Sequence, residues 1–440
     1  MALITGEVST MSTPDAPETN GYASLYRPGK VHSSVYTSSD IFEAEIDQIF
    51  YRTWVYIGHE SEVPNVGDFQ TRQLGRQPVI LVRGKSGGVN VLFNRCRHRG
   101  AVVAEAECGY TKFFKCWWHG YVYDTDGALA EVPRKDAYPD DYIETLGGLS
   151  RPARVDNYRG FVFASMRSTG QSLTEYLGRA AAMIDYLVDA SPEGKIRVGP
   201  GVTKTKYDGN WKLLGMDGYH ADTVHASVFA VWRAKPNSGL GATHRGDVMS
   251  DKSPTVTRGL GNGHSMLDYR RQRLGHLEDY LDHLRSVEGG AEYIEAMWKK
   301  HGKERGDELL AVAGDAHVAI YPNFHIANNH VRIISPVSAN ETKLFMYPVT
   351  LLGVSDQLNE ARLRTHESFY GSASAGSPDD AEIFERVQRG MQTKADPWLD
   401  LSRGMHREKV DSDGSIVGAI SDEVPQREQM REWVRLMTAE

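Results

Sequence analysis

The sequence predicts an α+β protein in which a small antiparallel β domain is inserted into a larger domain of helices and antiparallel sheet. From Gly67 to Ser165, short runs rich in β-branched and aromatic residues are separated by turn residues. Beyond Thr174, segments with helical spacing and strand-like runs are mixed. The 440 residues suffice for two or three domains. We expect a disordered arm over residues 1–22, a helical region that packs on the larger domain over 23–57, the β domain over 58–168, and the larger domain over 169–440.

The composition is that of an ordinary soluble globular chain. Hydrophobic residues make up 40% of it and charged residues 25%. A formal net charge of −8 argues against nucleic acid or an anionic membrane as a partner. No apolar run reaches the length of about eighteen residues that predicts a transmembrane helix, and the N-terminal segment lacks the features of a secretory signal. We therefore expect a cytoplasmic protein.

Cap and turn signals place the elements of the first part of the chain. Ser39 and Asp40 are expected to cap an amphipathic helix over residues 39–51, and a strand is expected over 54–58. The β domain is expected to hold strands over 69–74, 78–84 and 89–95, a hairpin over 120–129 with Asp126-Gly127 as its turn, and a closing strand over 161–165.

The larger domain is expected to combine several helices with an antiparallel sheet. Helices are predicted over 173–187, 210–229, 274–284, 288–310, 356–370, 378–392 and 426–437, and strands over 196–207, 317–326, 330–337 and 342–352. Residues 235–264 show little periodicity and predict a long loop, for which a flexible lid is our hypothesis. The tail from Lys409 is charged and rich in turn residues.

One stretch pairs a cysteine with a histidine twice. It reads Cys96-x-His98, then seventeen residues, then Cys116-x₂-His119. Two thiolates and two imidazoles are the ligands of a Rieske-type 2Fe–2S cluster, with the cysteines on one iron and the histidines on the other. Zinc is the alternative, but zinc fingers pair Cys with Cys and His with His. The stretch therefore predicts a one-electron centre, and the remaining cysteine, Cys108, is expected to be a free thiol.

A second group of metal-ligating residues lies in the predicted helix over 210–229. It reads Asp217-x₂-His220-x₄-His225. Two histidines and a distant carboxylate are the ligands of non-haem Fe(II) oxygenases, in which one face of the iron stays open. On a regular helix a five-residue gap turns by about 140°, so both histidines reach one metal only if the helix is distorted or ends between them. We predict such a distortion near residues 221–224.

Taken in order, these motifs and the intervening Asn210-Trp211-Lys212 closely resemble the large (α) subunits of Rieske non-haem iron aromatic-ring-hydroxylating dioxygenases. The resemblance runs from about Trp54 to the C-terminus, whose pattern looks like the benzoate, toluate and terephthalate branch. It implies a helix-grip (START-like) fold for the larger domain, which would hold the mononuclear iron. It also implies that the iron ligands are His220, His225 and Asp380, with Asp379 as the neighbouring candidate.

The resemblance implies a division of labour between two metal centres. The cluster takes electrons from a ferredoxin, an NAD(P)H-linked reductase, or both, and the mononuclear Fe(II) uses O₂ to convert an aromatic ring to a cis-dihydrodiol. In a head-to-tail homotrimer, with or without a small β subunit, one chain's cluster lies beside the next chain's iron. Asp217 resembles the carboxylate that bridges the two centres. The family branch favours an aromatic carboxylate as substrate.

The chain departs from the family in the wall of the pocket. Only four residues separate Asn210-Trp211-Lys212 from Asp217, fewer than in family members, so Leu213 and Met216 suggest an apolar wall. Arg332, in the predicted strand HVRIISPV, would pair with a substrate carboxylate if it faces the pocket. A structural ion pair or a solvent-facing position is the alternative for Arg332.

Two other functions remain open on sequence grounds. A Rieske monooxygenase, either a salicylate-type ring hydroxylase or a demethylase, uses the same ligands. A Rieske electron carrier would need the cluster but no mononuclear iron, and the long segment after the β domain argues against it.

Overall fold

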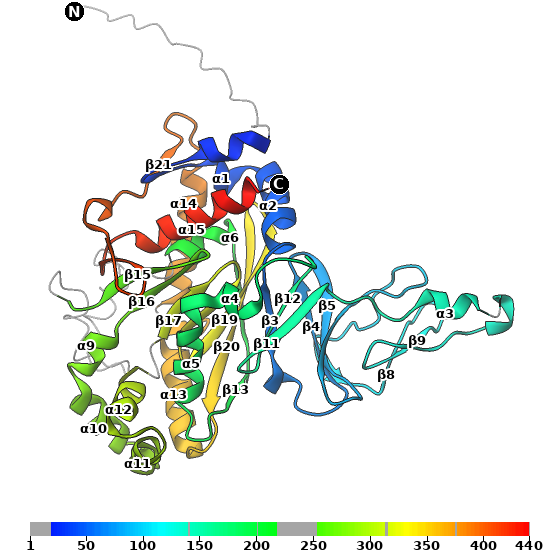
Figure 1. The fold of residues 1–440 in the computed structure, drawn as a ribbon, viewed down its shortest axis with the longest axis horizontal. Coiled ribbons are helices and arrows are strands. Elements are labelled where there is room, and N and C mark those ends of the chain that lie inside the picture. The colour runs from blue at the N-terminus through cyan, green and yellow to red at the C-terminus, as the bar shows by residue number, and fades with distance from the viewer. Residues whose placement is uncertain are drawn as a thin grey trace, which may run out of the picture.

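Paired strands hold the small β domain on one side of the larger domain (Figure 1). The computed structural model describes residues 19–139, 141–199, 201–217, 253–312, 316–374 and 376–439. The chain enters the small domain after β3 (Val55–His59) and returns through β11 (Arg154–Tyr158) and β12 (Phe161–Ser165). β12 pairs with both β11 and β3, so the entry and exit of the small domain are joined in one antiparallel sheet. The predicted α+β class with an inserted β domain is confirmed.

Two further sheets build the small domain. The first has the order β6-β5-β4-β7 and consists of β4 (Asp68–Leu74), β5 (Gln77–Arg83), β6 (Val89–Phe93) and β7 (Cys108–Tyr110). The second has the order β10-β9-β8 and consists of β8 (Phe113–Lys115), β9 (Val122–Asp124) and β10 (Leu129–Glu131). Apolar residues that alternate along these strands, including Ile80, Val82, Leu92, Phe114 and Tyr123, form the core. β4, β5, β6 and the β9–β10 hairpin agree with the sequence prediction, whereas β7 and β8 were not predicted.

The larger domain is built on a ten-stranded antiparallel sheet. Its order is β13-β20-β19-β18-β17-β16-β15-β23-β22, and β14 also pairs with β20. Its strands are β13 (Ile196–Val198), β14 (Thr203–Tyr207), β15 (Val256–Gly261), β16 (His264–Asp268), β17 (Ala316–Ile320), β18 (Phe324–Asn328), β19 (His330–Ser338), β20 (Glu341–Leu351), β22 (Lys409–Val410) and β23 (Ile416–Ala419). A small separate sheet joins β1 (Tyr26–Arg27), β2 (Lys30–His32) and β21 (Trp398–Asp400).

Helices surround this sheet (Figure 1). The α-helices of the described residues are α1 (Ser34–Thr37), α2 (Ser39–Glu45), α3 (Tyr142–Leu146), α4 (Leu173–Leu177), α5 (Ala181–Asp189), α6 (Trp211–Asp217), α9 (Arg270–Leu274), α10 (Leu277–Arg285), α11 (Gly290–His301), α12 (Lys303–Val312), α13 (Asp356–Tyr370), α14 (Ser377–Gly390) and α15 (Val424–Met437). Shorter turns are η1 (Thr19–Leu25), the π-helical η2 (Ile46–Phe50), η3 (Glu60–Glu62), η4 (Lys135–Ala137), η5 (Gly178–Ala180) and η6 (Met405–Arg407). Among the described helices, none is both long and apolar enough to cross a membrane.

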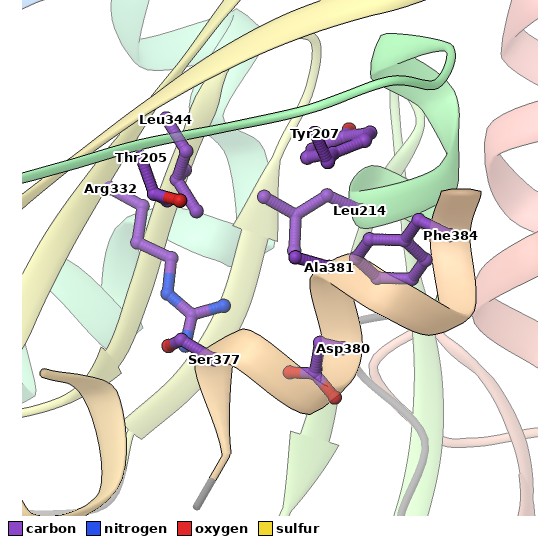
Figure 2. Close-up of a pocket in the computed structure, with 9 residues that line it drawn as sticks. All are labelled: Thr205, Tyr207, Leu214, Arg332, Leu344, Ser377, Asp380, Ala381 and Phe384. Carbon is purple, nitrogen blue, oxygen red and sulfur yellow. The ribbon is translucent and has the colours of Figure 1, made fainter. Parts of the chain in front are cut away.

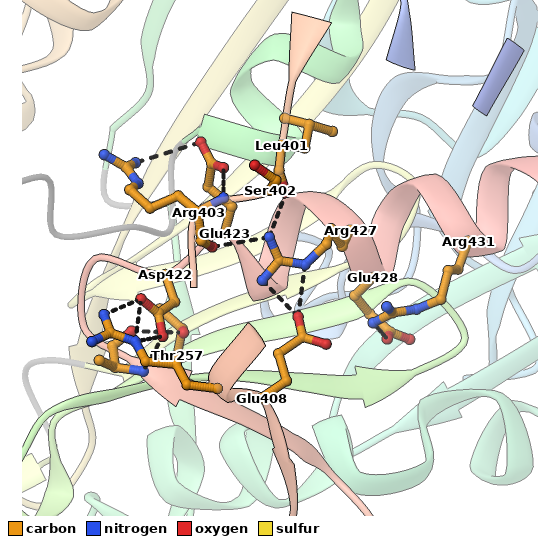
Figure 3. Close-up of polar contacts among 12 residues, drawn as sticks. Thr257, Leu401, Ser402, Arg403, Glu408, Asp422, Glu423, Arg427, Glu428 and Arg431 are labelled. Atoms are coloured by element: carbon orange, nitrogen blue, oxygen red, sulfur yellow. Dashed lines mark hydrogen bonds and ion pairs between the residues drawn. The ribbon is translucent and has the colours of Figure 1, made fainter. Parts of the chain in front are cut away.

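Buried ion pairs fasten the C-terminal segment to the larger domain (Figure 3). Arg427, in α15, is 1% exposed and donates to Glu408 and to the backbone carbonyls of Leu401 and Arg403. Asp422, which is fully buried, pairs with Arg407. Because these charges are satisfied by specific partners, the segment before α15 has a defined path across the sheet edge.

Several sequence predictions differ from the structure in their details. Ser38, rather than Ser39 or Asp40, caps α2, since its side chain accepts the Ile41 N–H. Residues 196–207 form two strands because the chain turns near Gly199, which has a φ of +86°. Residues 317–326 likewise form two strands, β17 and β18. Residues 19–22 of the predicted disordered arm belong to η1.

The predicted long loop and tail contain strands of the main sheet. β15 and β16 form a hairpin around Asn262-Gly263, both with positive φ, which is a favoured sequence for a tight hairpin turn. β23 of the tail then pairs with β15. The main part of the hypothetical lid and the predicted helix distortion at 221–224 lie outside the described residues.

Candidate functional site

The two Cys/His motifs form matching loops of the small domain. Cys96 follows β6 and Cys116 follows β8, and each Cys N–H donates to a backbone carbonyl further along its loop at 2.8 Å. In each loop a glycine four residues after the cysteine, Gly100 or Gly120, returns its N–H to the cysteine carbonyl at 3.0 Å. Both glycines have positive φ, so each loop bends back on itself and directs its cysteine inward.

The histidines of the two loops face each other above the buried thiols. The ring centroids of His98 and His119 are 4.7 Å apart, and His98 stacks on Tyr121 at 4.8 Å. Cys96 and Cys116 are both 2% exposed and form no disulfide. The Nδ1 atoms of both histidines are buried and have no hydrogen-bond partner within the described part of the chain.

These four side chains fit a 2Fe–2S cluster in this position. Buried polar atoms without a partner are rare in folded proteins, and ligation explains both orphaned imidazole nitrogens. No three described His, Cys, Asp or Glu residues converge on one metal ion, whereas a binuclear cluster needs only two protein ligands on each iron. Burial, together with His119 and Arg99, lowers the pKa of His98, which favours the neutral imidazole that binds metal.

A tyrosine supports the cysteine side of this centre. The Tyr123 hydroxyl lies 3.3 Å from the Cys96 Sγ and accepts the backbone N–H of Arg97 at 2.9 Å. Because the hydroxyl accepts from Arg97, its own proton is free to point at the sulfur. Hydrogen bonds to cluster sulfurs tune the reduction potential. Cys108, in the edge strand β7, is exposed, as expected for a free thiol.

A second candidate site lies on the polar face of the large sheet. Alternation along β19 directs Val331 and Ile333 into the apolar core on one side and His330 and Arg332 to the other. Arg332 pairs across the strands with His325 of β18 and Met346 of β20. Buried cationic and imidazole side chains in place of aliphatic ones mark this face as functional.

A small pocket opens between this face and helices α6 and α14 (Figure 2). Its lining residues are Thr205, Tyr207, Leu214, Arg332, Leu344, Ser377, Asp380, Ala381 and Phe384. Asp380 lies in the first turn of α14 together with Asp379, and of these two carboxylates Asp380 lines the pocket. Leu214, rather than its predicted neighbour Leu213, forms part of the apolar wall; Leu213 is 3% exposed in a core cluster.

Buried histidines and a tyrosine surround Arg332. Its Nε donates to the Nε2 of His330 at 2.8 Å, and its guanidinium lies 4.8 Å from the centre of the Tyr370 ring. His366, on α13, lies 4.6 Å from His330 ring to ring. Burial lowers the pKa of His366 to about 4 and lowers the pKa of His330 well below its ordinary value. The charge of Arg332 lowers both pKa values further. The two histidines and Tyr370 around Arg332 are therefore neutral, and the guanidinium is the charged member of this cluster.

The sequence pattern contained a signal for this group that the prediction missed. His330 and Arg332 alternate with Val331 and Ile333 in one strand, so the two polar side chains share a face with each other and not with the aliphatic ones. The contribution of α13 was not visible, because the chain gives no local indication that His366 and Tyr370 pack against β19.

Several predicted site residues lie outside the described part of the chain. His220 and His225 fall in residues 218–252, which are outside the described residues. Met216 and Asp217 belong to α6, but only their backbone is described. α6 begins inside a buried cluster, since Trp211 and Lys212 are 0% and 1% exposed. The helix that leads into the second ligand motif is therefore fixed at its start.

A domain with two Cys/His loops, joined to a sheet-and-helix domain with a carboxylate-bearing pocket, defines an iron–sulfur protein with an attached catalytic domain. Comparison with known families identifies both parts. Residues 53–151 match the Rieske [2Fe–2S] domain, and residues 192–439 match the catalytic domain of the ring-hydroxylating α subunit. The chain belongs to the ring-hydroxylating α-subunit family of oxidoreductases.

Individual relatives agree with this assignment. The chain is 32% identical to the large subunit of anthranilate 1,2-dioxygenase from Acinetobacter baylyi, over 86% of this chain and 81% of the relative. It is 33% identical to the large subunit of 2-halobenzoate 1,2-dioxygenase from Burkholderia cepacia, over 84% and 79%. The crystal structure of naphthalene 1,2-dioxygenase from Rhodococcus sp. has the same fold, with a TM-score of 0.78 at 20% identity over 96% of this chain and 97% of that one.

The cofactors follow from the family. A Rieske 2Fe–2S cluster belongs to the small domain and a mononuclear iron to the catalytic domain. The predicted START-like combination of helices with a long antiparallel sheet agrees with the structure.

Proposed function

We propose that this chain is the terminal oxygenase component that adds both atoms of O₂ to adjacent carbons of an aromatic carboxylate, giving a cis-dihydrodiol in the catabolism of aromatic compounds. Electrons come from NAD(P)H through a reductase, with or without a ferredoxin. The family assignment supports the reaction class. The single observation that carries the substrate class is Arg332, a buried guanidinium that lines the pocket and contacts an imidazole and a phenol ring.

The ligand assignment is part of the proposal. Cys96 and Cys116 hold one iron of the cluster and His98 and His119 hold the other, with the orphaned Nδ1 atoms as donors. The mononuclear Fe(II) is assigned to three residues, His220, His225 and Asp380. When bound, this iron supplies the activation of O₂ next to the ring. Asp380 is preferred to Asp379 because it lines the pocket.

The protein's own residues orient the ring. The apolar wall formed by Leu214, Leu344 and Phe384 excludes water and packs against the ring faces. Arg332 binds the carboxylate, because a guanidinium and a carboxylate form parallel charge-assisted hydrogen bonds. Together these contacts fix which ring edge is directed at Asp380 and the iron. The two relatives named above bear the names of benzoates that carry an amino group or a halogen, which fits this substrate class.

Electron transfer is proposed to cross between chains. In Figure 1 the β8–β9 end of the small domain points away from the larger domain and from α14. Within one chain, the β8–β9 hairpin therefore lies apart from α14. We propose a homotrimer, with or without a small β subunit, in which Asp217 bridges a cluster histidine of one chain to an iron histidine of the next. Such a carboxylate fixes the tautomers of both imidazoles. Thiolate ligands suit a reducing compartment, which favours the cytoplasm.

Turnover of a substrate panel tests the proposal. The purified holoenzyme is supplied with NADH, a surrogate reductase and ferredoxin, and benzoates, phthalates, salicylates, anilines and biaryls in turn, and products are identified by mass spectrometry. We expect cis-dihydrodiols from benzoates and slower turnover of the uncharged rings. Phenolic or demethylated products without diols would instead identify a monooxygenase. Absence of any product, with two irons per chain rather than three, would identify an electron carrier.

A further inference from the structure

The Nε–H of Arg332 is held by a neutral acceptor, the imidazole of His330. Three other arginines with largely buried side chains each pair with a carboxylate, namely Arg72 with Glu62, Arg258 with Asp268, and Arg427 with Glu408, whereas the buried Nε and Nη2 of Arg362 have no hydrogen-bond partner in the described part of the chain. Arg332, which is 4% exposed, instead donates its Nε–H to the Nε2 of His330. A carboxylate in this place would neutralise the guanidinium, whereas a neutral imidazole fixes its position and leaves its full positive charge.

His330 is built to remain that neutral acceptor. Its side chain is fully buried, and burial, Arg332 and His366 all disfavour the imidazolium. Because its Nε2 accepts from Arg332, the ring proton lies on Nδ1. The Tyr370 ring lies 4.4 Å from the His330 ring and 4.8 Å from the guanidinium carbon, so α13 closes over both side chains.

The contact determines which edge of Arg332 faces the pocket. A guanidinium offers a carboxylate either its Nε edge or the edge between its two terminal nitrogens. His330 occupies the Nε edge. The terminal nitrogens extend from β19 toward Ser377 at the start of α14 (Figure 2). A bound carboxylate therefore meets the guanidinium end-on, and the aromatic ring attached to it lies along the direction of the arginine side chain.

We infer that His330 is a positioning residue that determines the enzyme's selectivity for aromatic carboxylates, by holding Arg332 so that its terminal nitrogens bind the substrate carboxylate end-on. This inference rests on the proposed substrate class. It assigns to β19 both the residue that binds the substrate's charge and, two positions earlier on the same face, the residue that orients it.

Binding to the anaerobic holoenzyme tests the inference without turnover. The dissociation constants of benzoate and of benzamide, which has the same ring without the charge, are measured by calorimetry for the wild type and for R332Q, H330L and H330Q. The ratio of the benzamide constant to the benzoate constant is the selectivity. Leucine is similar in size to histidine but has no acceptor, whereas glutamine retains one. H264Q is the matched control, since His264 is a buried histidine of the same sheet, 1% exposed, and does not line the pocket.

We expect the selectivity to fall at least about tenfold in R332Q and about tenfold in H330L, because a hydrogen bond to a charged group is lost or left unoriented. H330Q should recover most of it, and H264Q should keep the wild-type ratio. An H330L variant with wild-type selectivity, while R332Q loses it, would overturn the role of His330 alone. If R332Q also keeps the wild-type ratio, the proposed substrate class fails and the role of His330 fails with it.

Discussion

Asp379 and Asp380 are adjacent in the first turn of α14, and the direction of each side chain distinguishes them. Successive residues of a helix point about 100° apart, so one carboxylate can face the pocket while its neighbour faces elsewhere. Asp380 is the one that lines the pocket. The sequence could offer both as iron ligands, because their choice depends on how α14 packs on β14 and not on any local pattern.

Asp380→Ala should remove the mononuclear iron and leave the cluster in place. One of three proposed protein ligands is lost, whereas the cluster ligands lie in a separate domain. Iron analysis should therefore fall from three to two irons per chain, with the visible absorption of the cluster unchanged. Asp379→Ala is the matched control and should keep three irons. The opposite pattern would move the assignment to Asp379.

Buried neutral histidines make the folded state sensitive to acid. His264 accepts the Tyr321 N–H at its Nδ1, with a 3.0 Å separation, and its Nε2 lies 2.7 Å from the carbonyl of Tyr176, so the fold holds one neutral tautomer. Burial lowers its pKa from 6.5 to about 4. The unfolded chain then binds a proton between pH 6.5 and 4 that the folded chain does not, so stability is complete above pH 6.5 and falls as the pH decreases through this interval.

Because of His264, the free energy of unfolding should be about 2 kcal/mol lower at pH 5 than at pH 8. Urea denaturation of the wild type and of His264→Gln at the two pH values measures it. The variant should be less stable at pH 8 but should lose about 2 kcal/mol less than the wild type on acidification. Equal losses in both proteins would contradict the assignment.

At the scale of elements, one buried carboxylate joins three helices. Glu45, at the end of α2 and fully buried, accepts from the indole N–H groups of Trp211 at 2.8 Å and Trp433 at 2.7 Å and from the ammonium of Lys212 at 2.6 Å. Trp211 and Lys212 begin α6, and Trp433 lies in α15. The N-terminal region, the helix that leads into the second ligand motif and the C-terminal helix therefore share one anchor.

Glu45→Gln should destabilise the protein by about 3–5 kcal/mol, because the Lys212 ammonium would be left buried without its counter-charge. Chemical denaturation monitored by tryptophan fluorescence measures the change. Glu43→Gln is the matched control: Glu43 lies on the same helix but is exposed and pairs with Arg76. Its substitution should cost no more than about 1 kcal/mol. Similar losses for the two variants would rule out the anchor.

The elements also show where sequence patterns suffice and where they do not. Strands β4, β5, β6, β9 and β10 of the β domain and helices α13 and α14 were predictable, because alternation or helical spacing and turn residues agree locally. β15 and β16 were missed although Asn262-Gly263 is a strong hairpin signal, since glycines at 259 and 261 interrupt the apolar alternation. The pairing of β23 with β15 was beyond prediction, because it joins segments that lie far apart in the sequence.

At the scale of the whole molecule, the two metal centres are built on separate parts of the chain. The proposed ligands of the cluster follow from spacing alone, since Cys-x-His and Cys-x₂-His pairs have few other uses. On the polar face of the large sheet, Arg332 was predicted and His330 was predictable from the alternation along β19, whereas His366 and Tyr370 are brought there from α13 by the fold. In Figure 1 the β8–β9 hairpin and α14 lie at different ends of the molecule, an arrangement that no single element determines.

Asp217→Ala should leave both metals bound and slow the transfer of electrons between them. An outer-shell carboxylate of this kind typically contributes about 10–100-fold to the function of a metal site. Stopped-flow reoxidation of the reduced cluster in the presence of substrate and O₂ measures the rate, and iron analysis and cluster absorption serve as the controls. Reoxidation at the wild-type rate would contradict the bridging role.

We propose that this chain inserts both oxygen atoms of O₂ into one aromatic acid. Turnover of benzoate with ¹⁸O₂ by the holoenzyme, its reductase and NADH shows how many atoms of O₂ enter the product. We predict a cis-dihydrodiol that carries two labelled oxygen atoms, formed in proportion to the NADH consumed. A product with a single labelled atom, the other atom of O₂ having been reduced to water, would contradict this proposal.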